Sequence, residues 1–296
     1  MKILITDGIS GEGKKILEEA GHECIIQFYE PDELVKNIPD YDAILVRSAT
    51  KVPKEVIDAG KNLKVIARGG AGIDNIDHKY AASLGIPVLN TPGANSASVA
   101  ELALAHMFAL SRFVHIANVS MREGKWDKKK YKGIEIDGRT LGIAGFGKIG
   151  QILAQKAIAL GMSVLVYDII DVKTSLPVKQ VTLDELLAQS DFVSLHVPKM
   201  AQPLIGAAEL KKMKKTAYLV NCARGGVVDE AALLDALNND VIAGAGLDVF
   251  MEEPTKNLEL VSHPKVSATP HVGASTVEAQ DRVGIEIAHK IAEALK

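Results

Sequence analysis

The sequence is poor in cysteine: among its 296 residues only Cys24 and Cys222 occur, and they lie far apart. Two cysteines are too few for a disulfide framework or a cysteine-based metal site, so we expect no bound metal and a reducing compartment. Long apolar runs are also missing, because Asp7 interrupts the apolar N-terminus and the most apolar helical stretch, residues 102–110, is far shorter than a membrane span. We therefore expect a soluble, cytoplasmic protein.

The sequence also lacks a large excess of either positive or negative charge. Lysine and arginine number 34 and aspartate and glutamate 37, which gives a formal net charge of −3. Such a chain has no general attraction to nucleic acid or to membranes, and we expect neither as a partner. Any anionic ligand must be held by a local basic cluster. With 47% hydrophobic residues the chain is globular in composition, and its length suits two ordinary domains.

What the sequence does contain is a regular alternation of short β-rich runs and longer amphipathic stretches, which predicts parallel sheets covered by helices. Two α/β units in tandem are expected, joined by the turn-rich residues 90–95. One long helix is expected from Ser96 to about Met121. The predicted strands are residues 2–6, 23–28, 43–46, 63–67 and 87–89 in the first unit, and 140–144, 163–167, 192–195, 217–221, 243–247 and 265–268 in the second.

The strand at residues 140–144 runs into a Gly-x-Gly-x-x-Gly loop made by Gly145, Gly147 and Gly150. A helix follows, and then a second strand that leads to Asp168, 18 residues after Gly150. These elements in this order form a dinucleotide-binding fingerprint. Asp168 would accept hydrogen bonds from ribose hydroxyls and repel a 2′-phosphate, so we expect NAD rather than NADP. The alternative is a glycine turn in an unrelated α/β protein.

Three polar residues, Arg224, Glu253 and His271, each follow a predicted strand late in the chain. Because ligands bind beyond the carboxyl ends of parallel strands, all three could face one crevice. Oxidation of a secondary alcohol needs a base for the hydroxyl proton, and an imidazole, with an unperturbed pKa of about 6.5, suits that task. Glu253 would orient the imidazole, and Arg224 would bind a substrate carboxylate. Taken singly, each residue is more often structural.

The segments around these residues resemble those of the D-isomer-specific 2-hydroxyacid dehydrogenases. The likeness rests on Arg224 in an Asn-x-x-Arg-Gly motif, Glu253 before proline and His271 after proline, at separations of 29 and 18 residues. It covers essentially the whole chain, and it implies that these three residues are catalytic. The fingerprint and the resemblance together place the cofactor contacts at Gly145, Phe146, Gly147, Lys148, Ile149, Gly150, Asp168, His196, Val197, Pro198, Cys222, Ala223, Asp248 and Gly273.

Within that family the chain is most similar to the D-3-phosphoglycerate dehydrogenases, above all in His271-Val-Gly-Ala-Ser-Thr-Val-Glu-Ala-Gln280. Basic residues after predicted strands of the first domain could neutralise a phosphate, and the N–H groups of a glycine-rich loop could bind a carboxylate. The predicted substrate residues are Arg47, Lys51, Arg68, Gly70, Ala71 and Gly72. Lys128, Lys129 and Lys130 are better interpreted as a solvated surface.

The resemblance implies two Rossmann-like or flavodoxin-like domains with parallel sheets and an active-site cleft between them. Residues 1–95 would form the substrate-binding domain, with the helix at 276–296 returning to it, and residues 96–275 the NAD-binding domain. A homodimer is expected, since family members usually pair through the cofactor domain. Many phosphoglycerate dehydrogenases continue into a serine-sensing domain; because this chain stops at Lys296, we expect no serine feedback through such a domain.

The leading hypothesis is therefore NAD-dependent oxidation of 3-phospho-D-glycerate to 3-phosphohydroxypyruvate, the first step of serine biosynthesis. Three alternatives stay open. The chain could act on glyoxylate, hydroxypyruvate or D-lactate; it could be a non-enzymatic regulator that binds NAD; or it could be a redox protein that uses Cys222, although no second cysteine lies nearby.

Overall fold

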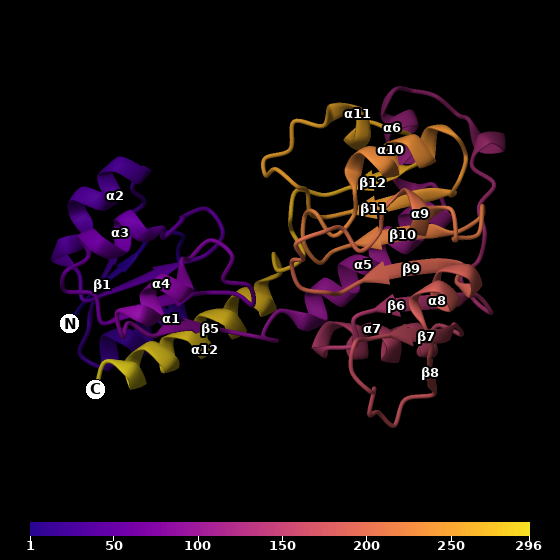
Figure 1. Ribbon diagram of the computed structural model, residues 1–296. Helices are drawn as coiled ribbons and strands as arrows, with labels where there is room; N and C mark the ends of the chain where they lie inside the picture. Colours follow the sequence, from indigo (N-terminus) through magenta and orange to yellow (C-terminus); the bar gives the residue numbers. More distant parts are fainter. The chain divides into compact units, whose positions relative to one another are not determined.

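The computed structural model describes residues 1–296 and divides the chain into two compact units. The first unit consists of Met1–Asn95 together with Ala274–Lys296, and the second is Ser96–Gly273. In Figure 1 the first unit comprises the indigo and violet elements with the yellow C-terminal helix, and the second comprises the magenta-to-orange elements.

The first unit is built on a parallel five-stranded sheet in the order β2-β1-β3-β4-β5. The central strand β3 is Ala-Ile-Leu-Val and is buried along its whole length, as expected for a parallel strand covered on both faces. The strands are β1 (Lys2–Ile5), β2 (Glu23–Ile26), β3 (Ala43–Val46), β4 (Val65–Arg68) and β5 (Val88–Asn90), and the helices are α1 (Gly11–Glu19), α2 (Pro31–Asn37), η1 (Ile38–Asp40), α3 (Lys54–Ala59), α4 (His78–Ser83) and α12 (Val277–Ala294).

The C-terminal helix α12 belongs to the first unit because it packs closely on α1, beside which it lies in Figure 1. A Cβ atom added to Gly13 of α1 would lie 2.6 Å from the carbonyl oxygen of Gly284 on α12. Lys290 Nζ also donates a hydrogen bond of 2.8 Å to the Asn90 carbonyl. Residues at opposite ends of the chain therefore share one core.

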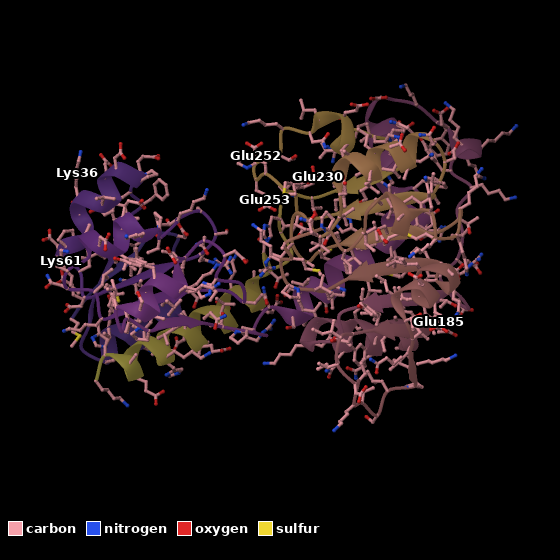
Figure 2. All side chains as sticks on the ribbon, viewed as in Figure 1. Lys36, Lys61, Glu185, Glu230, Glu252 and Glu253 are labelled. Carbon is pink, nitrogen blue, oxygen red and sulfur yellow. The ribbon has the colours of Figure 1, made fainter.

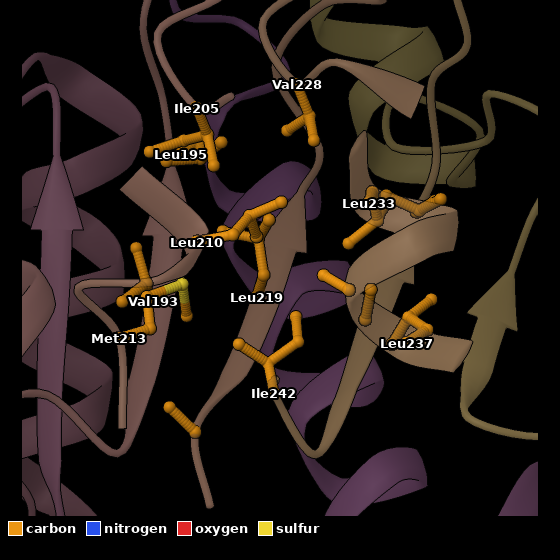
Figure 3. Close-up of a cluster of buried hydrophobic side chains, with 14 of the residues drawn as sticks. Val193, Leu195, Ile205, Leu210, Met213, Leu219, Val228, Leu233, Leu237 and Ile242 are labelled. Carbon is orange, nitrogen blue, oxygen red and sulfur yellow. The ribbon is translucent and has the colours of Figure 1, made fainter. Parts of the chain in front are cut away.

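The second unit contains a parallel seven-stranded sheet in the order β12-β11-β10-β9-β6-β7-β8. Figure 3 shows how Val193 and Leu195 of β9 and Leu219 of β10 meet Leu210, Leu233 and Leu237 from the helices on one face. The strands are β6 (Thr140–Ala144), β7 (Ser163–Tyr167), β8 (Val178–Gln180), β9 (Phe192–Leu195), β10 (Tyr218–Asn221), β11 (Gly244–Leu247) and β12 (Val266–Ala268), and the helices are α5 (Ser96–Ser111), α6 (Val114–Arg122), η2 (Lys128–Lys130), α7 (Lys148–Ala159), α8 (Leu183–Gln189), α9 (Ala207–Leu210), α10 (Glu230–Asn238) and α11 (Leu258–Val261).

The prediction of two α/β units with parallel sheets is confirmed. The prediction of one helix from Ser96 to about Met121 is wrong. The chain forms α5 and α6, bent by 65°, because α5 ends at Ser111 and Phe113, the N-cap of α6, adopts a left-handed conformation with φ of 57°. No single helix has the length and apolar composition of a membrane span; α5 and α6 reach them only as this bent pair.

Candidate active site

The glycine loop joins β6 to α7, and two of its three glycines occupy places that a larger side chain would disturb. Gly145 has φ of 92°, and a Cβ there would lie 2.4 Å from the His196 carbonyl oxygen. A Cβ on Gly150 would lie 2.4 Å from the Gly145 carbonyl oxygen. Gly147, the N-cap of α7, differs: a Cβ there meets no atom within 4 Å, so the residue faces open space at the start of the helix. Exposed N–H groups and an open approach at a helix N-terminus fit a pyrophosphate.

Asp168, which follows β7, braces this loop from the neighbouring strand. Its Oδ2 accepts a hydrogen bond of 2.7 Å from the Phe146 N–H, and its Oδ1 accepts one of 3.3 Å from the Ile170 N–H. The carboxylate therefore fixes the backbone between Gly145 and Gly147. Ile169 and Ile170 beside it are exposed, and residues 168–172 contain no lysine or arginine that could attract a 2′-phosphate.

His196 follows β9 and ends beneath the glycine loop. Its Nε2 lies 2.9 Å from Ser194 Oγ, while its buried Nδ1 has no partner. Burial lowers the pKa of His196 to about 4, so the ring is neutral at physiological pH. Val197 contributes to the same loop wall, and its side chain would touch a Cβ on Gly145. The enclosed Nδ1 is thus a buried polar atom without a hydrogen-bond partner at this end of the sheet.

Glu253 and His271 form a close pair at the same edge of the sheet, after β11 and β12. His271 Nδ1 lies 2.6 Å from Glu253 Oε2, and both side chains are partly exposed. Burial favours the neutral form of Glu253. Hydrogen bonds from His271 and from the Phe250 N–H, with the nearby charges of His271 and Arg224, nevertheless hold the pKa of Glu253 below its usual value. Because a carboxylate only accepts, Nδ1 carries a proton in either charge state of the ring, and in the neutral ring Nε2 holds the lone pair.

The loop that carries Glu253 is held from α10. Glu230, the first residue of that helix, accepts hydrogen bonds from the Met251 N–H at 2.6 Å and from Asn257 Nδ2 at 3.3 Å. Figure 2 labels Glu230, Glu252 and Glu253 in this region of the second unit. The loop is thus tied at both of its ends.

Arg224 follows β10, the strand next to β11. Asn221 Nδ2 donates to the Arg224 carbonyl at 3.0 Å, and Asn221 Oδ1 accepts from the Ala223 N–H at 3.1 Å, so one buried amide shapes this turn. A Cβ on Gly225 would lie 1.7 Å from the Phe250 carbonyl oxygen. The Arg224 turn and the Glu253 loop are therefore in backbone contact. Cys222 and Ala223 are buried in the same turn, and burial raises the pKa of the Cys222 thiol, which disfavours a reactive thiolate.

Asp248 is buried directly after β11 and binds the loop that carries His271. Its Oδ1 accepts from the Val272 N–H at 2.8 Å and its Oδ2 accepts from the Gly273 N–H at 2.8 Å. Gly273 is closely packed, since a Cβ there would lie 3.0 Å from Asp248 Oδ2 and would push against it. The structure thus brings these predicted residues of the second unit together along the carboxyl edge of β6, β7 and β9 to β12.

The predicted substrate residues of the first unit lie after β3 and at the end of β4. Arg47 is held through its backbone: its N–H donates to Asp7 Oδ2 at 2.7 Å, and its carbonyl accepts from Asn75 Nδ2 at 2.8 Å and from Arg68 Nε at 3.2 Å. Arg68 also donates to the Gly72 carbonyl. Arg68 therefore donates hydrogen bonds both to the loop after β3, at Arg47, and to the loop after β4, at Gly72.

Three further polar contacts complete this network. Asp7 accepts from the Thr50 hydroxyl at 2.7 Å and from the Thr50 N–H at 3.0 Å, and Asn75 donates to the Thr50 carbonyl at 2.6 Å. Sequence reasoning missed Asp7 and Asn75, as it missed Asn221, although Asp7 and Asn221 also stand at or near the end of a strand. Lys51 is exposed. The lysines at 128–130 form the exposed short helix η2, as their solvated interpretation predicts.

The model of the D-isomer specific 2-hydroxyacid dehydrogenase NAD-binding domain matches residues 104–273. The chain belongs to this family. It is 48% identical to a hydroxypyruvate reductase of Thermotoga maritima, over 98% of this chain and 97% of the relative. It is 44% identical to a D-3-phosphoglycerate dehydrogenase of Methanocaldococcus jannaschii, over the whole of this chain but only 58% of the relative.

Solved structures agree. An NAD-dependent formate dehydrogenase from Staphylococcus aureus in complex with NAD superimposes with a TM-score of 0.87 at 32% identity, covering 100% of this chain and 95% of the other. The chain is thus a D-2-hydroxyacid dehydrogenase with NAD as its cofactor, and both predictions are confirmed.

Proposed function

We propose that the chain catalyses NAD-dependent oxidation of 3-phospho-D-glycerate to 3-phosphohydroxypyruvate, the first step of serine biosynthesis. The observation that carries the catalytic part is the 2.6 Å pair of His271 Nδ1 and Glu253 Oε2, in a family of NAD-dependent dehydrogenases.

In this proposal His271 Nε2 takes the proton of the substrate hydroxyl. Glu253 keeps the imidazole in the tautomer that this step needs, and its negative charge stabilises the imidazolium that results. Arg224 binds the substrate carboxylate with its planar guanidinium and, in the reverse direction, polarises the carbonyl. NAD, when bound, accepts the hydride that leaves the carbinol carbon.

The cofactor would be held by residues from the glycine loop and the neighbouring strand ends. The N–H groups of the α7 N-terminus would bind the pyrophosphate, and Asp168 the ribose hydroxyls. The full set proposed is Gly145, Phe146, Gly147, Lys148, Ile149, Gly150, Asp168, His196, Val197, Pro198, Cys222, Ala223, Asp248 and Gly273.

The phosphate specificity is assigned to the first unit, residues 1–95 with the C-terminal helix. The backbone of Arg47 is fixed by Asp7 and Asn75, and its guanidinium is proposed to bind the phosphate. An arginine carried on a fixed backbone suits bidentate recognition of a dianion. Lys51 and Arg68 add positive charge, and the N–H groups of Gly70, Ala71 and Gly72 are proposed to bind the substrate carboxylate.

Reduction of hydroxypyruvate is the second candidate. It is favoured by the Thermotoga maritima relative, which matches this chain along nearly its whole length, whereas the chain spans 58% of the phosphoglycerate dehydrogenase. The same His271, Glu253 and Arg224 would serve, with the proton moving from the imidazolium to the substrate oxygen. A non-enzymatic regulator is disfavoured, because a regulator needs no paired imidazole and carboxylate.

One assay separates these candidates. NADH absorbance is followed in both directions, with 3-phospho-D-glycerate, D-glycerate and D-lactate as alcohols and with hydroxypyruvate and glyoxylate as carbonyl substrates. We expect the highest kcat/KM for the phosphorylated acid and a selective loss of that preference in Arg47→Ala. Equal activity on unphosphorylated acids, unchanged by Arg47→Ala, would discard the phosphate assignment and keep the dehydrogenase. NAD binding with no turnover on any substrate would discard the proposal.

A homodimer that forms through the NAD-binding domain and acts in the cytoplasm stays a prediction. Sedimentation velocity of the purified chain tests the first part.

A further inference from the structure

A buried histidine outside the proposed catalytic set lies behind it. His106, in the middle of α5, is 2% exposed. Its ring packs over β11 at Gly246, where an added Cβ would lie 2.7 Å from His106 Cβ. From there the ring reaches the next strand: Nδ1 lies 2.9 Å from Ser267 Oγ, and Nε2 lies 3.1 Å from Thr269 Oγ1. An imidazole in this position has both nitrogens committed to the segment that leads to His271.

The directions of these hydrogen bonds follow from the donors available. The Thr269 hydroxyl donates its single proton to Asp248 Oδ1 at 2.6 Å, because a carboxylate only accepts. Thr269 Oγ1 must then accept from His106, which places the ring proton on Nε2. Ser267 in turn donates to Nδ1. Burial lowers the pKa of His106 to about 4, against the opposing charge of Asp248 and with a small further lowering from His115, so the ring is neutral at pH 7.

The hydrogen bonds from His106 to Thr269 and from Thr269 to Asp248 form a relay, which ends on the backbone around His271. Asp248 accepts from Thr269, Val272 and Gly273, which leaves His271 between two anchored segments. His271 itself has φ of 54°, a left-handed conformation that costs a residue with a Cβ of order 1 kcal/mol or more and persists only where neighbours impose it. The Thr269 carbonyl also accepts from the His271 N–H at 3.1 Å.

We propose that His106 is a positioning residue for His271: its Nε2–H fixes the Thr269 hydroxyl, which directs Asp248 to hold residues 269–273 in the conformation that pairs His271 with Glu253. This inference rests on the proposed role of His271. His106 touches neither of the paired side chains and acts only through Thr269 and Asp248.

Three substitutions at one position test the relay. In His106→Leu the apolar volume is kept and both hydrogen bonds are lost, so Thr269 can rotate away from Asp248. We expect kcat to fall about tenfold or more, because a misplaced catalytic group costs up to about 100-fold. Since Asp248 and Gly273 also belong to the proposed cofactor set, NAD binding should weaken as well, but by less than kcat falls. His106→Gln places an amide N–H near the position of Nε2 and should recover most of kcat. His106→Asn, whose amide reaches only toward Ser267, should not.

Met107→Ala is the matched control. Met107 is fully buried on the same helix, so its truncation lowers the melting temperature through lost packing without touching the relay. A second measurement is independent of turnover: in protein labelled with ¹⁵N-histidine, the His106 ring should show the neutral Nε2–H pattern from about pH 6 to pH 8.

The outcomes separate this inference from the proposed function. If His271→Ala abolishes turnover and His106→Leu retains it, or if Met107→Ala lowers kcat as much as His106→Leu, the positioning role is overturned and the proposed function stands. A neutral Nδ1–H pattern for His106 would also overturn it. If His271→Ala keeps full turnover, the proposed catalytic role fails first.

Discussion

At the scale of single residues, the contacts of Glu253 determine its protonation state. It accepts from His271 Nδ1 and from the Phe250 N–H, and these contacts outweigh the effect of its partial burial on the pKa. The carboxylate is therefore ionised throughout the neutral range, and the imidazole tautomer is set by it.

Glu253→Gln should lower kcat by at least about 100-fold and leave KM for the 2-hydroxy acid within about threefold, since the amide can no longer stabilise an imidazolium. Steady-state kinetics with the best substrate of the panel measures both. The neighbouring Glu252, exposed and paired with Lys256 at 2.6 Å, gives the control Glu252→Gln, for which we expect unchanged kinetics. Similar losses in the two variants would mean that loop charge, and not the pair, matters.

Asp168 makes a second residue-scale prediction, because its carboxylate has two tasks. Asp168→Asn keeps an oxygen that can accept from the Phe146 N–H but removes the charge that repels a 2′-phosphate. We expect NADP to bind at least about tenfold more tightly than in the unchanged chain, a gain of about 1.4 kcal/mol, with NAD within about threefold. Fluorescence titration with both cofactors measures this, with exposed Asp171→Asn as the control. An unchanged NAD-to-NADP ratio would remove Asp168 from the discrimination.

At the scale of elements, the sequence predicts strands well where burial dominates. The runs at Thr140–Ala144, Ser163–Tyr167 and Phe192–Leu195 are apolar, and the structure has them at the predicted bounds. β8 was missed because Val-Lys-Gln is short, polar and at a sheet edge. The break at Phe113 was missed because a left-handed residue other than glycine leaves no local signal.

The difference between features with a local sequence pattern and features without one also decides which site residues the sequence predicts. Motif residues such as Arg224 stand out because three of them follow predicted strands of one domain, within motifs that can be matched in the sequence. His106 was hidden: inside an apolar helical stretch, one histidine is indistinguishable from a core residue until Ser267 and Thr269 are brought to it. Only the pairing of β11 with β12 and the packing of α5 reveal the relay.

A further prediction at the scale of elements concerns Asp191, which directly precedes β9 and contacts the first residue of β6. Asp191 accepts from the Thr140 N–H at 2.9 Å and from Lys214 Nζ at 2.9 Å. Burial alone would raise the pKa of Asp191, but these hydrogen bonds and the charge of Lys214 lower it overall. A lowered pKa in the folded state stabilises the protein above the unfolded pKa, and this stabilisation is lost as pH falls through the folded value.

Asp191→Asn should therefore reduce the free energy of unfolding at pH 7 by about 2 kcal/mol, and the difference from the unchanged chain should shrink below about pH 4. Urea denaturation at a series of pH values measures it. Asp184→Asn, which removes an exposed pair with Lys212, should cost about 0.5 kcal/mol or less. A difference that persists unchanged to low pH would show that packing, and not charge, is responsible.

At the scale of the whole molecule, the first unit is closed by residues from both ends of the chain, with the second unit inserted between them. Its core joins Leu17 of α1 and Ile3 of β1 to Ile287 and Ile291 of α12. The two units have separate cores, so a defect in the α1–α12 contact should be felt in one of them.

Gly284→Val tests this separation. A Cβ at Gly284 would lie 2.1 Å from Ser10 Oγ. Ser10 caps α1, because its Oγ accepts a hydrogen bond of 3.2 Å from the Gly13 N–H. The valine must therefore displace the Ser10 side chain as well as the helix. We expect the first unit to lose about 2 kcal/mol or more, from overpacking and the lost cap, while Kd for NAD stays within about twofold. Hydrogen exchange read by peptide should show faster exchange in residues 1–95 and 274–296 and unchanged exchange in 96–273. His289→Val places the same side chain at an exposed position of α12 and should change neither. Faster exchange throughout both units, with weaker NAD binding, would mean that they unfold as one, and that the C-terminal helix stabilises the cofactor site as well as its own core.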